Sequence, residues 1–320
     1  MDIMNINPNK HKDAQRYVFQ FWHSGFEHAQ PVVQSCMESW RKGCERIGFK
    51  HIIISEGDLD YWEAQFPEPI EKKLNHFRHH ATCWEDAKWR RYSNMLRLAL
   101  LSSFNGIWAD STLLLMKPIE DWLPDATSSG GLQLCKGASD LLIENWFICS
   151  LSESPLLNSW LEHYVDYNTE VQRDARQYLA KKYSVPGIMF RIQRHLPRAK
   201  TWWFGWMLRK AYKRIPYFAN YYSFEYVLKR QTPHALNYQL FLPFDLAGWS
   251  FFNSTQKPDL KVEDVNPTLI KSLLMLPFVK LDWKRSPDDK LDQLEAKYLL
   301  SLLWNDSNAK MMLTNQTIPH

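Results

Sequence analysis

The first half of the sequence alternates β-rich runs with stretches of helical periodicity, and this alternation constrains the fold more than any other feature. Apolar or β-rich runs predict strands, and Pro at the start of a periodic stretch predicts that a helix begins there. We predict strands at 17–22, 49–55, 106–116, 132–136 and 145–150, and helices at 31–43, 58–66, 86–104 and from Pro155 past Tyr167. Such alternation predicts an α/β sheet with crossover helices.

Two of these segments carry more specific expectations. The run at 49–55 is almost continuously apolar, which is typical of a buried parallel strand. Asn105-Gly106 follows the longest helix and supplies residues that tolerate the left-handed conformation, so the helix is expected to stop there.

The second half is less regular, because Pro186, Pro197, Pro216 and Pro233 interrupt its helical patterns. The tail after Asn305 is polar. With 320 residues, of which 45% are hydrophobic, the chain can build a sizeable core as one large domain or two small ones.

Charge and cysteine content exclude several classes of protein. A net charge of +4 does not by itself indicate nucleic-acid binding. The five cysteines include no CxxC pair, which favours reduced thiols in a cytosolic compartment over a disulfide or zinc framework. We expect no secretory signal, because the N-terminus lacks an apolar core, and no transmembrane helix, because no apolar run approaches ~20 residues.

Basic residues are concentrated between Arg173 and Arg230, where the only acids are Asp174 and Glu225. Within this region the segment 194–222 interleaves Lys and Arg with Trp202, Trp203 and Trp206. That composition suits an anionic membrane surface, and equally a core helix with a basic rim or a groove for an acidic glycan. Nucleic-acid binding is disfavoured, because no nucleic-acid motif accompanies the aromatic residues.

A histidine cluster, His76, His79 and His80, lies in the stretch NHFRHH. It has no Cys or acid partners at the spacing of metal ligands, so we expect a surface loop there.

Asp110 follows the predicted strand GIWA and precedes Ser111 and Thr112. Ligands of open α/β sheets bind outside the carboxyl ends of the strands. A carboxylate and a hydroxyl two residues apart can both face Mg²⁺ or Mn²⁺, which prefer oxygen ligands. The alternative is that Asp110 caps the turn that follows.

Ser93, Asn94 and Arg97 share one face of the predicted helix, because they are spaced three and four residues apart. The planar guanidinium of Arg97 suits a phosphate or a ribose–phosphate edge. The alternative is an ordinary solvated face of an amphipathic helix.

These stretches resemble the capsular polysaccharide synthesis glycosyltransferases. FQFWHSGFEHAQPVVQSCMESW is similar to the family's aromatic strand followed by P-x-x-V-x-x-C-x-x-S. YSNMLRLALLSSFNGIWADST is similar to its S-D-x-x-R and G-G-I-W-x-D-x-T. ENWFICSLSESPLLNSWLEHY and LPFVKLDWKR resemble its W-F-I, P-L-L and K-L-x-W-K elements, so the resemblance extends from Phe19 to Lys284.

The resemblance implies a DxD-type sugar transferase with a GT-A-like nucleotide-binding sheet flanked by helices, using a UDP- or GDP-sugar and Mn²⁺ or Mg²⁺. Phe21 and Trp22 would lie beside the nucleotide base, and Arg97 and Asn94 would contact the donor. Asp110 and Thr112 would form the metal site. Asn145 and Trp146 would line the sugar or acceptor side, and Lys280 would approach the diphosphate.

The chain departs from the family pattern at three positions. The Asp of S-D-x-x-R is Asn94, the first Gly of the Gly-Gly turn is Asn105, and the second Asp of DxD is Thr112. An amide keeps hydrogen-bonding capacity and loses the negative charge, so Asn94 could alter donor choice or weaken activity. Asp140 and Glu144 are candidates for a catalytic base, the alternative being loop carboxylates in water.

We therefore predict an α/β protein with a nucleotide-sugar-binding half at 14–170, a more helical acceptor half at 171–304 and a polar tail at 305–320. The predicted function is transfer of a sugar to a capsular-type polysaccharide or its lipid-linked precursor, with the resemblance implying a retaining outcome. The alternative is a degenerate, non-catalytic member of a capsule assembly complex. The predicted location is the cytoplasm, with peripheral contact on the inner face of a bacterial plasma membrane through 194–222 as a further hypothesis.

Overall fold

The fold is taken from a computed structural model that describes residues 16–81, 85–123, 132–136, 143–169, 219–230, 238–243 and 276–281. The helices are α1 (Pro31–Ile47), α2 (Leu59–Glu63), α3 (Glu68–His80), α4 (Glu85–Phe104), α5 (Pro155–Thr169) and α9 (Ala219–Arg230). The strands are β1 (Tyr17–Phe21), β2 (Lys50–Ile54), β3 (Gly106–Ala109), β4 (Leu113–Leu115), β5 (Leu132–Lys136), β6 (Ile143–Ser150), β7 (Tyr238–Pro243) and β8 (Phe278–Lys280).

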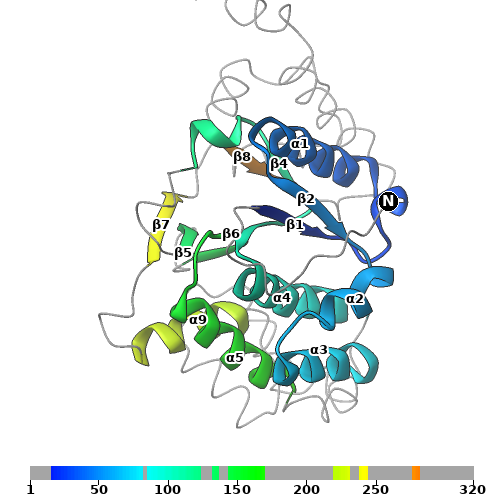
Figure 1. The fold of residues 1–320 in the computed structure, drawn as a ribbon, viewed down its shortest axis with the longest axis vertical. Helices are drawn as coiled ribbons and strands as arrows, with labels where there is room; N and C mark the ends of the chain where they lie inside the picture. The colour runs from blue at the N-terminus through cyan, green and yellow to red at the C-terminus, as the bar shows by residue number, and fades with distance from the viewer. Residues whose placement is uncertain are drawn as a thin grey trace, which may run out of the picture. The chain divides into compact units, whose positions relative to one another are not determined.

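The described strands form a mixed sheet of order β2-β1-β3-β6-β5-β7 and a separate pair, β4-β8 (Figure 1). Strands β1 and β3 are parallel, with Phe19 opposite Trp108, whereas β5 is antiparallel to β6 and parallel to β7. This confirms the predicted α/β class, with a sheet flanked by helices. The sheet is mixed because β5 and β6 are joined by a short connection, and a short connection can join only antiparallel neighbours.

The chain divides into two compact units, and the divisions fall within β1 after Phe19 and within β3 after Trp108. The first unit comprises 1–19, 57–108 and 126–243, and the second comprises 20–56, 109–125 and 244–320.

In the first unit, α3, α4, α5 and α9 pack side by side (Figure 1). The apolar stripe of α4, which includes Met95, Leu98 and Ala99, is completely buried. Aromatic rings fill the space beside β1, where Phe19, Trp62 and Phe104 meet edge to face. Burial of such large apolar side chains is the main stabilising contribution to this unit.

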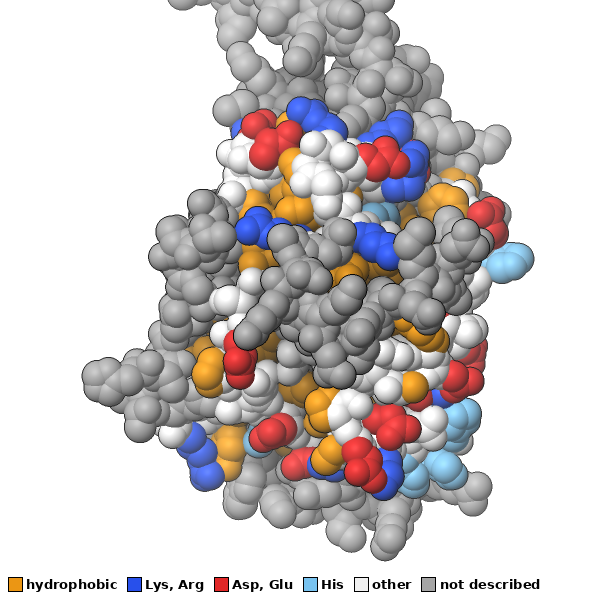
Figure 2. All heavy atoms as spheres, viewed as in Figure 1, with side chains coloured by type: hydrophobic (Ala, Val, Ile, Leu, Met, Phe, Trp, Pro, Cys, Tyr) orange, Lys and Arg blue, Asp and Glu red, His pale blue; other side chains and the backbone are white. Residues whose placement is uncertain are grey.

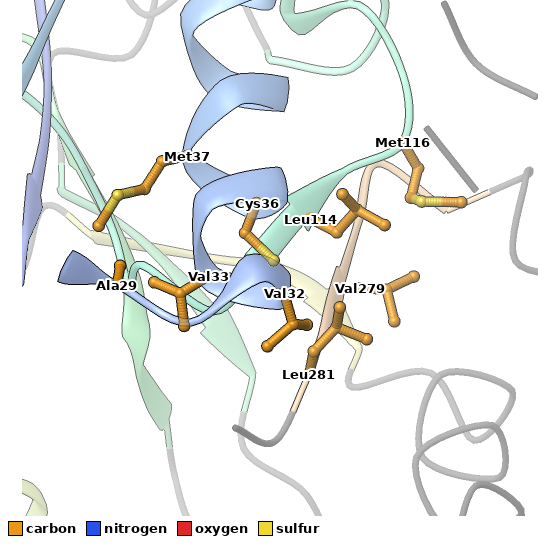
Figure 3. Packing of buried hydrophobic residues seen from close by; sticks show 9 residues of the cluster. All are labelled: Ala29, Val32, Val33, Cys36, Met37, Leu114, Met116, Val279 and Leu281. Carbon is orange, nitrogen blue, oxygen red and sulfur yellow. The ribbon is translucent and has the colours of Figure 1, made fainter. Parts of the chain in front are cut away.

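In the second unit, α1 packs on the β4 and β8 segments. Figure 3 shows side chains of α1 gathered with those of the two segments in a buried cluster, which comprises Ala29, Val32, Val33, Cys36, Met37, Leu114, Met116, Val279 and Leu281. Helix α1 begins with Pro31 at its first turn, as the sequence pattern predicts. It extends beyond the predicted end at residue 43 to Ile47, where Gly48 in the left-handed conformation stops it.

Most of the predicted elements are confirmed, with two differences around Asp110 and β2. The predicted strand at 106–116 is two strands, β3 and β4, because Asp110 to Thr112 form a turn between them. The run at 49–55 does form β2, but only Ile54 is buried and the other four residues are half-buried. The helix stop at Asn105 is confirmed, since Asn105 has a φ of 46°.

The expectation of a loop at His76, His79 and His80 is wrong, because these residues form the last turns of α3. The sequence carries the signal for this helix: Pro69 in the first turn and apolar residues at Ile70, Leu74 and Phe77. The histidines are exposed, and Figure 2 shows histidine and acidic side chains on the surface over α3.

Among the helices in the described ranges, none is both long and apolar enough to cross a bilayer. The basic and aromatic segment 194–222 lies outside the described residues, except for its last four positions on α9.

Candidate functional site

Arg97 is the buried centre of the candidate site in the first unit. It lies on α4, and only 4% of the residue is exposed. The guanidinium donates hydrogen bonds to the carbonyl of Asn145 on β6, to Ser93 O at 3.3 Å and to Ser93 Oγ at 3.2 Å. Its carbon also lies 4.8 Å from the ring centroid of Trp108, within cation–π range. The alternative of a solvated helix face is therefore wrong for Arg97.

Asn94, on the same helix as Arg97, also contacts Asn145, through a hydrogen bond between the two side chains. Asn145 Nδ2 donates to Asn94 Oδ1 over 3.2 Å, and Asn94 Nδ2 lies 3.4 Å from the hydroxyl of Tyr164. Burial raises the pKa of Tyr164, so this hydroxyl stays protonated near neutral pH. The structure thus joins Asn94 and Arg97 of α4 to Asn145 of β6, residues that the sequence placed in two separate motifs.

Glu144 lies beside this network on β6. It is 9% exposed, so the alternative of a loop carboxylate in water is wrong for this residue. The hydroxyl of Tyr221 on α9 lies 3.2 Å from Glu144 Oε2 and 3.0 Å from Asn145 Oδ1, and it can donate to one of them at a time. The other candidate base, Asp140, lies outside the described residues.

Asp110, Thr112 and Lys280 form a separate cluster in the second unit. Lys280 Nζ donates to Asp110 Oδ2 over 2.8 Å and to Thr112 Oγ1 over 2.6 Å. Thr112 is buried, whereas the side chains of Asp110 and Lys280 are 24% and 30% exposed. The carboxylate and the hydroxyl therefore both face one cation, and that cation is the Lys280 ammonium.

Backbone contacts hold Asp110 in place. Its carbonyl oxygen accepts from Leu113 N at 2.8 Å, so the backbone closes the turn and the side chain is left to face Lys280. Ser111 Oγ donates to the carbonyl of Phe21 over 2.8 Å. Gln20 Nε2 lies 3.4 Å from the Asp110 carbonyl, and Gln20 Oε1 pairs with His51 Nε2 at 2.8 Å.

The residues of this cluster do not fit a divalent cation well. Mg²⁺ and Mn²⁺ take oxygen ligands, and the two oxygens that this cluster offers among the described residues, a carboxylate and a hydroxyl, are both occupied by the Lys280 ammonium. Both oxygens already accept hydrogen bonds from a cation, which would repel a metal ion placed between them. Within the described ranges, no group of three or more His, Cys, Asp or Glu could hold a metal.

The remaining predicted residues differ in exposure. Phe21 is buried, and its backbone carbonyl accepts the hydrogen bond from Ser111 Oγ. Trp22 is half-buried and packs against the hydrophobic cluster that α1 forms with the β4 and β8 segments. Trp146 is half-buried on β6, next to Asn145. Of the predicted residues, Asn94, Arg97, Glu144, Asn145 and Trp146 belong to the first unit, and Phe21, Trp22, Asp110, Thr112 and Lys280 belong to the second.

A family model described as "Capsular polysaccharide synthesis protein" matches residues 1–264. The chain belongs to this family. Membership confirms the resemblance found in the sequence and, with it, the expectation of an enzyme of the glycosyltransferase type. No curated protein matches the sequence.

Three solved structures give weaker similarities, all with a TM-score below 0.5, so they carry no argument about function. PaToxG glycosyltransferase is 13% identical, with 67% of this chain and 87% of that chain covered and a TM-score of 0.35. The UDP-bound glycosyltransferase domain of the YGT toxin is 8% identical, with 93% of this chain and 99% of that chain covered and a TM-score of 0.43. A glycosyltransferase involved in glycosylation of the major capsid of PBCV-1 is 10% identical, with 89% of this chain and 99% of that chain covered and a TM-score of 0.36.

Sequence reasoning missed three residues that contact the candidate site: Tyr164, Tyr221 and Trp108. Trp108 could have been found, because it lies on the strand that leads to Asp110. Tyr164 and Tyr221 lie 70 and 76 residues from their partners, and nothing local in the sequence distinguishes them from core tyrosines.

Proposed function

We propose that this member of the capsular polysaccharide synthesis family transfers a sugar from a UDP- or GDP-sugar to a surface polysaccharide or its lipid-linked precursor. One observation carries the proposal: Arg97 and Asn94 of α4 hydrogen-bond to the backbone and side chain of Asn145 on β6. The motif that the family resemblance assigns to the donor and the motif that it assigns to the sugar or acceptor side are therefore joined in one partly buried, hydrogen-bonded network.

The charge of Arg97 suits the chemistry of a nucleotide-sugar. As the bond between the anomeric carbon and the diphosphate breaks, its electron pair passes to the diphosphate oxygen, and negative charge grows there. A fixed guanidinium stabilises that charge more in the transition state than in the ground state. Its contacts with Ser93, Asn145 and Trp108 hold the group in one orientation before the donor binds.

Among the residues that the structure describes, Glu144 is the carboxylate that hydrogen bonding links to this network, so it can act at the sugar or acceptor side. Its buried position on β6 and its contact with Tyr221 fix its direction. In a retaining reaction the acceptor attacks from the face that the diphosphate leaves, and Glu144 would stabilise the oxocarbenium-like anomeric carbon. In an inverting reaction Glu144 would accept the proton of the acceptor hydroxyl.

A divalent ion, when bound, would stabilise the leaving diphosphate as a Lewis acid. The proposal does not depend on one, because the cluster of Asp110, Thr112 and Lys280 fits it poorly.

A second candidate function rests on Asn94. Where the family has a carboxylate, this chain has an amide whose oxygen already accepts a hydrogen bond from Asn145. A member that binds a nucleotide-sugar or glycan without turnover would tolerate this change. Binding without release of the nucleoside diphosphate would favour this candidate.

Peripheral contact with an anionic membrane through 194–222, from the cytoplasmic side, is a separate proposal. It rests on the Lys, Arg and Trp content of that segment. Flotation with anionic liposomes at low salt should recover the protein, and replacing Trp202, Trp203 and Trp206 together with Ala should reduce recovery. Absence of binding at low salt would contradict it.

Thermal denaturation with a panel of nucleotides and nucleotide-sugars tests the donor proposal. UDP or GDP, and one of their sugars, should raise the melting temperature of the wild-type chain. Arg97→Lys should lose most of this shift, because a lysine keeps the charge without the planar fork. The exposed Arg41→Lys, on α1, is the matched control and should keep it. A panel without any shift would contradict the proposal.

A further inference from the structure

The Lys280 ammonium occupies the place where a divalent cation was expected from the sequence. It lies 2.8 Å from Asp110 Oδ2 and 2.6 Å from Thr112 Oγ1, which are ordinary distances for charge-assisted hydrogen bonds. We propose that Lys280, oriented by Asp110 and Thr112, serves as the cation for the donor's diphosphate, so that donor binding and transfer need no metal ion. This inference rests on the proposed function and deepens it.

The backbone around Lys280 is fixed to the segment that carries Asp110. Leu281 N donates to Thr112 O over 2.9 Å, and Met116 N donates to Pro277 O over 2.8 Å, so hydrogen bonds are made on both sides of Lys280. In the register of the strand pair, Lys280 lies opposite Leu113. The ammonium therefore meets Asp110 and Thr112 through the strand pairing of β4 and β8.

The core of the second unit supports the same placement. Val279 and Leu281, on either side of Lys280, are buried in the cluster with α1 (Figure 3). Alternate side chains of a strand point to opposite faces, so burial of these two residues directs Lys280 away from the cluster. Its side chain remains 30% exposed, which leaves it accessible to a ligand.

The chemistry of an ammonium suits this role. It has three N–H donors, and the contacts with Asp110 and Thr112 use two of them, so a third can reach a diphosphate oxygen. In the transfer step the bond between the anomeric carbon and the diphosphate oxygen breaks, and a bond to the acceptor oxygen forms. The electron pair stays on the diphosphate, the acceptor proton leaves to a base, and Lys280 stabilises the diphosphate without being consumed.

Nucleotide binding to the full chain, measured by calorimetry with UDP and GDP in EDTA and again with Mn²⁺, tests the inference. Wild-type protein should bind the same nucleotide with equal affinity in both conditions. Lys280→Ala should bind it at least about tenfold more weakly in EDTA, the loss expected for one charge-assisted hydrogen bond. Mn²⁺ should restore part of this affinity, because Asp110 and Thr112 are then open to a metal. Lys117→Ala, a half-buried lysine of the same unit, should match the wild type.

A titration with Mn²⁺ alone gives a readout independent of the nucleotide. Removing the ammonium should strengthen Mn²⁺ binding relative to the wild type, and equal Mn²⁺ binding by the two proteins would contradict the inference. Nucleotide binding by the wild type only with Mn²⁺ would overturn the inference and leave the proposed function standing. Absence of binding in both conditions would overturn the proposed function and the inference with it. If Lys280→Ala does not fold, the wild-type comparison in EDTA still decides.

Discussion

The side-chain amide of Asn145 on β6 donates a hydrogen bond to Oδ1 of Asn94 on α4, across 3.2 Å. Asn145 also accepts a hydrogen bond from Arg97 through its backbone carbonyl. One residue of the sheet therefore positions both helix residues that the family resemblance assigns to the donor.

Asn94→Asp should fold normally, because both partners of Asn94 can donate to a carboxylate: Asn145 through Nδ2 and Tyr164 through its hydroxyl. We expect a melting temperature close to that of the wild type and a changed preference among nucleotide-sugars. Release of nucleoside diphosphate from a panel of donors measures this. Release by Asn94→Asp together with no release by the wild type would instead identify the natural chain as non-catalytic.

Gly106→Ala should destabilise the protein by about 1–3 kcal/mol, the usual cost of forcing an extra methyl group into a packed site. Gly106 has a φ of 153°, and an added Cβ would lie 2.5 Å from the carbonyl oxygen of Tyr17. Since that oxygen belongs to backbone paired with β3, it cannot move aside. Urea unfolding measures the change.

Asn105→Gly is the matched control, because Asn105 is already left-handed and Gly adopts that conformation without strain. Its effect should stay within about 0.5 kcal/mol, the small net effect expected when relief of strain is offset by a more flexible unfolded chain. Equal losses for the two variants would contradict the assignment of the close contact to Gly106.

Tyr92→Phe should cost about 1–2 kcal/mol, because it leaves a buried carboxylate with one hydrogen bond fewer. The hydroxyl of Tyr92 donates to Glu63, which is 2% exposed and also pairs with Arg78 at 2.8 Å. This network joins α2, α3 and α4. Equilibrium unfolding in urea measures the loss.

Lys72→Ala, which breaks an exposed ion pair with Glu68 on α3, is the control for that network. Exposed pairs contribute about 0–1 kcal/mol, so this variant should be nearly neutral. A neutral Tyr92→Phe would show that the buried carboxylate does not need the hydroxyl.

His51 should make stability depend on pH below neutrality. Burial, reinforced by Arg41, lowers the pKa of His51 to about 3, so the folded chain resists protonation that the unfolded chain accepts at about 6.5. The stabilisation is complete above pH about 6.5 and is lost as pH falls from there towards about 3. One titrating group can lower the free energy of unfolding by at most about 1.4 kcal/mol per pH unit. We expect a loss below this limit, because His51 is only half-buried and solvent screens its charge.

His51→Gln removes the titration and keeps a donor for Gln20. Unfolding free energies from pH 7.5 to 5 should therefore fall less steeply for this variant than for the wild type. Parallel pH curves would contradict a lowered pKa for His51.

The sequence predicted elements whose signals are local. Pro31 and Asn105 act through their own backbone preferences, and they predict the start of α1 and the end of α4. The expectation of a loop over α3 was wrong although Ile70, Leu74 and Phe77 mark a helix, because the run of exposed polar residues around the histidines is equally typical of a loop. The apolar run of β2 did not predict its exposure, which depends on what packs against the strand.

The residue types of the candidate site could be predicted, and their partners could not. Arg97 and Asn145 lie 48 residues apart, and Lys280 lies 170 residues from Asp110, so their contacts depend on the pairing of strands and helices. No local pattern in the sequence reports such a pairing. The burial of Arg97, which excludes a solvated face, follows from the same long-range packing.

The most direct test of the account is the release of UDP or GDP from nucleotide-sugars by the wild-type chain and by Arg97→Lys. The wild type should release nucleoside diphosphate from at least one donor. Arg97→Lys should do so about 10²-fold more slowly, the cost of losing one preorganised donor to the leaving group, while remaining folded. Equal release by the folded variant, or no release and no binding by the wild type, would contradict the account.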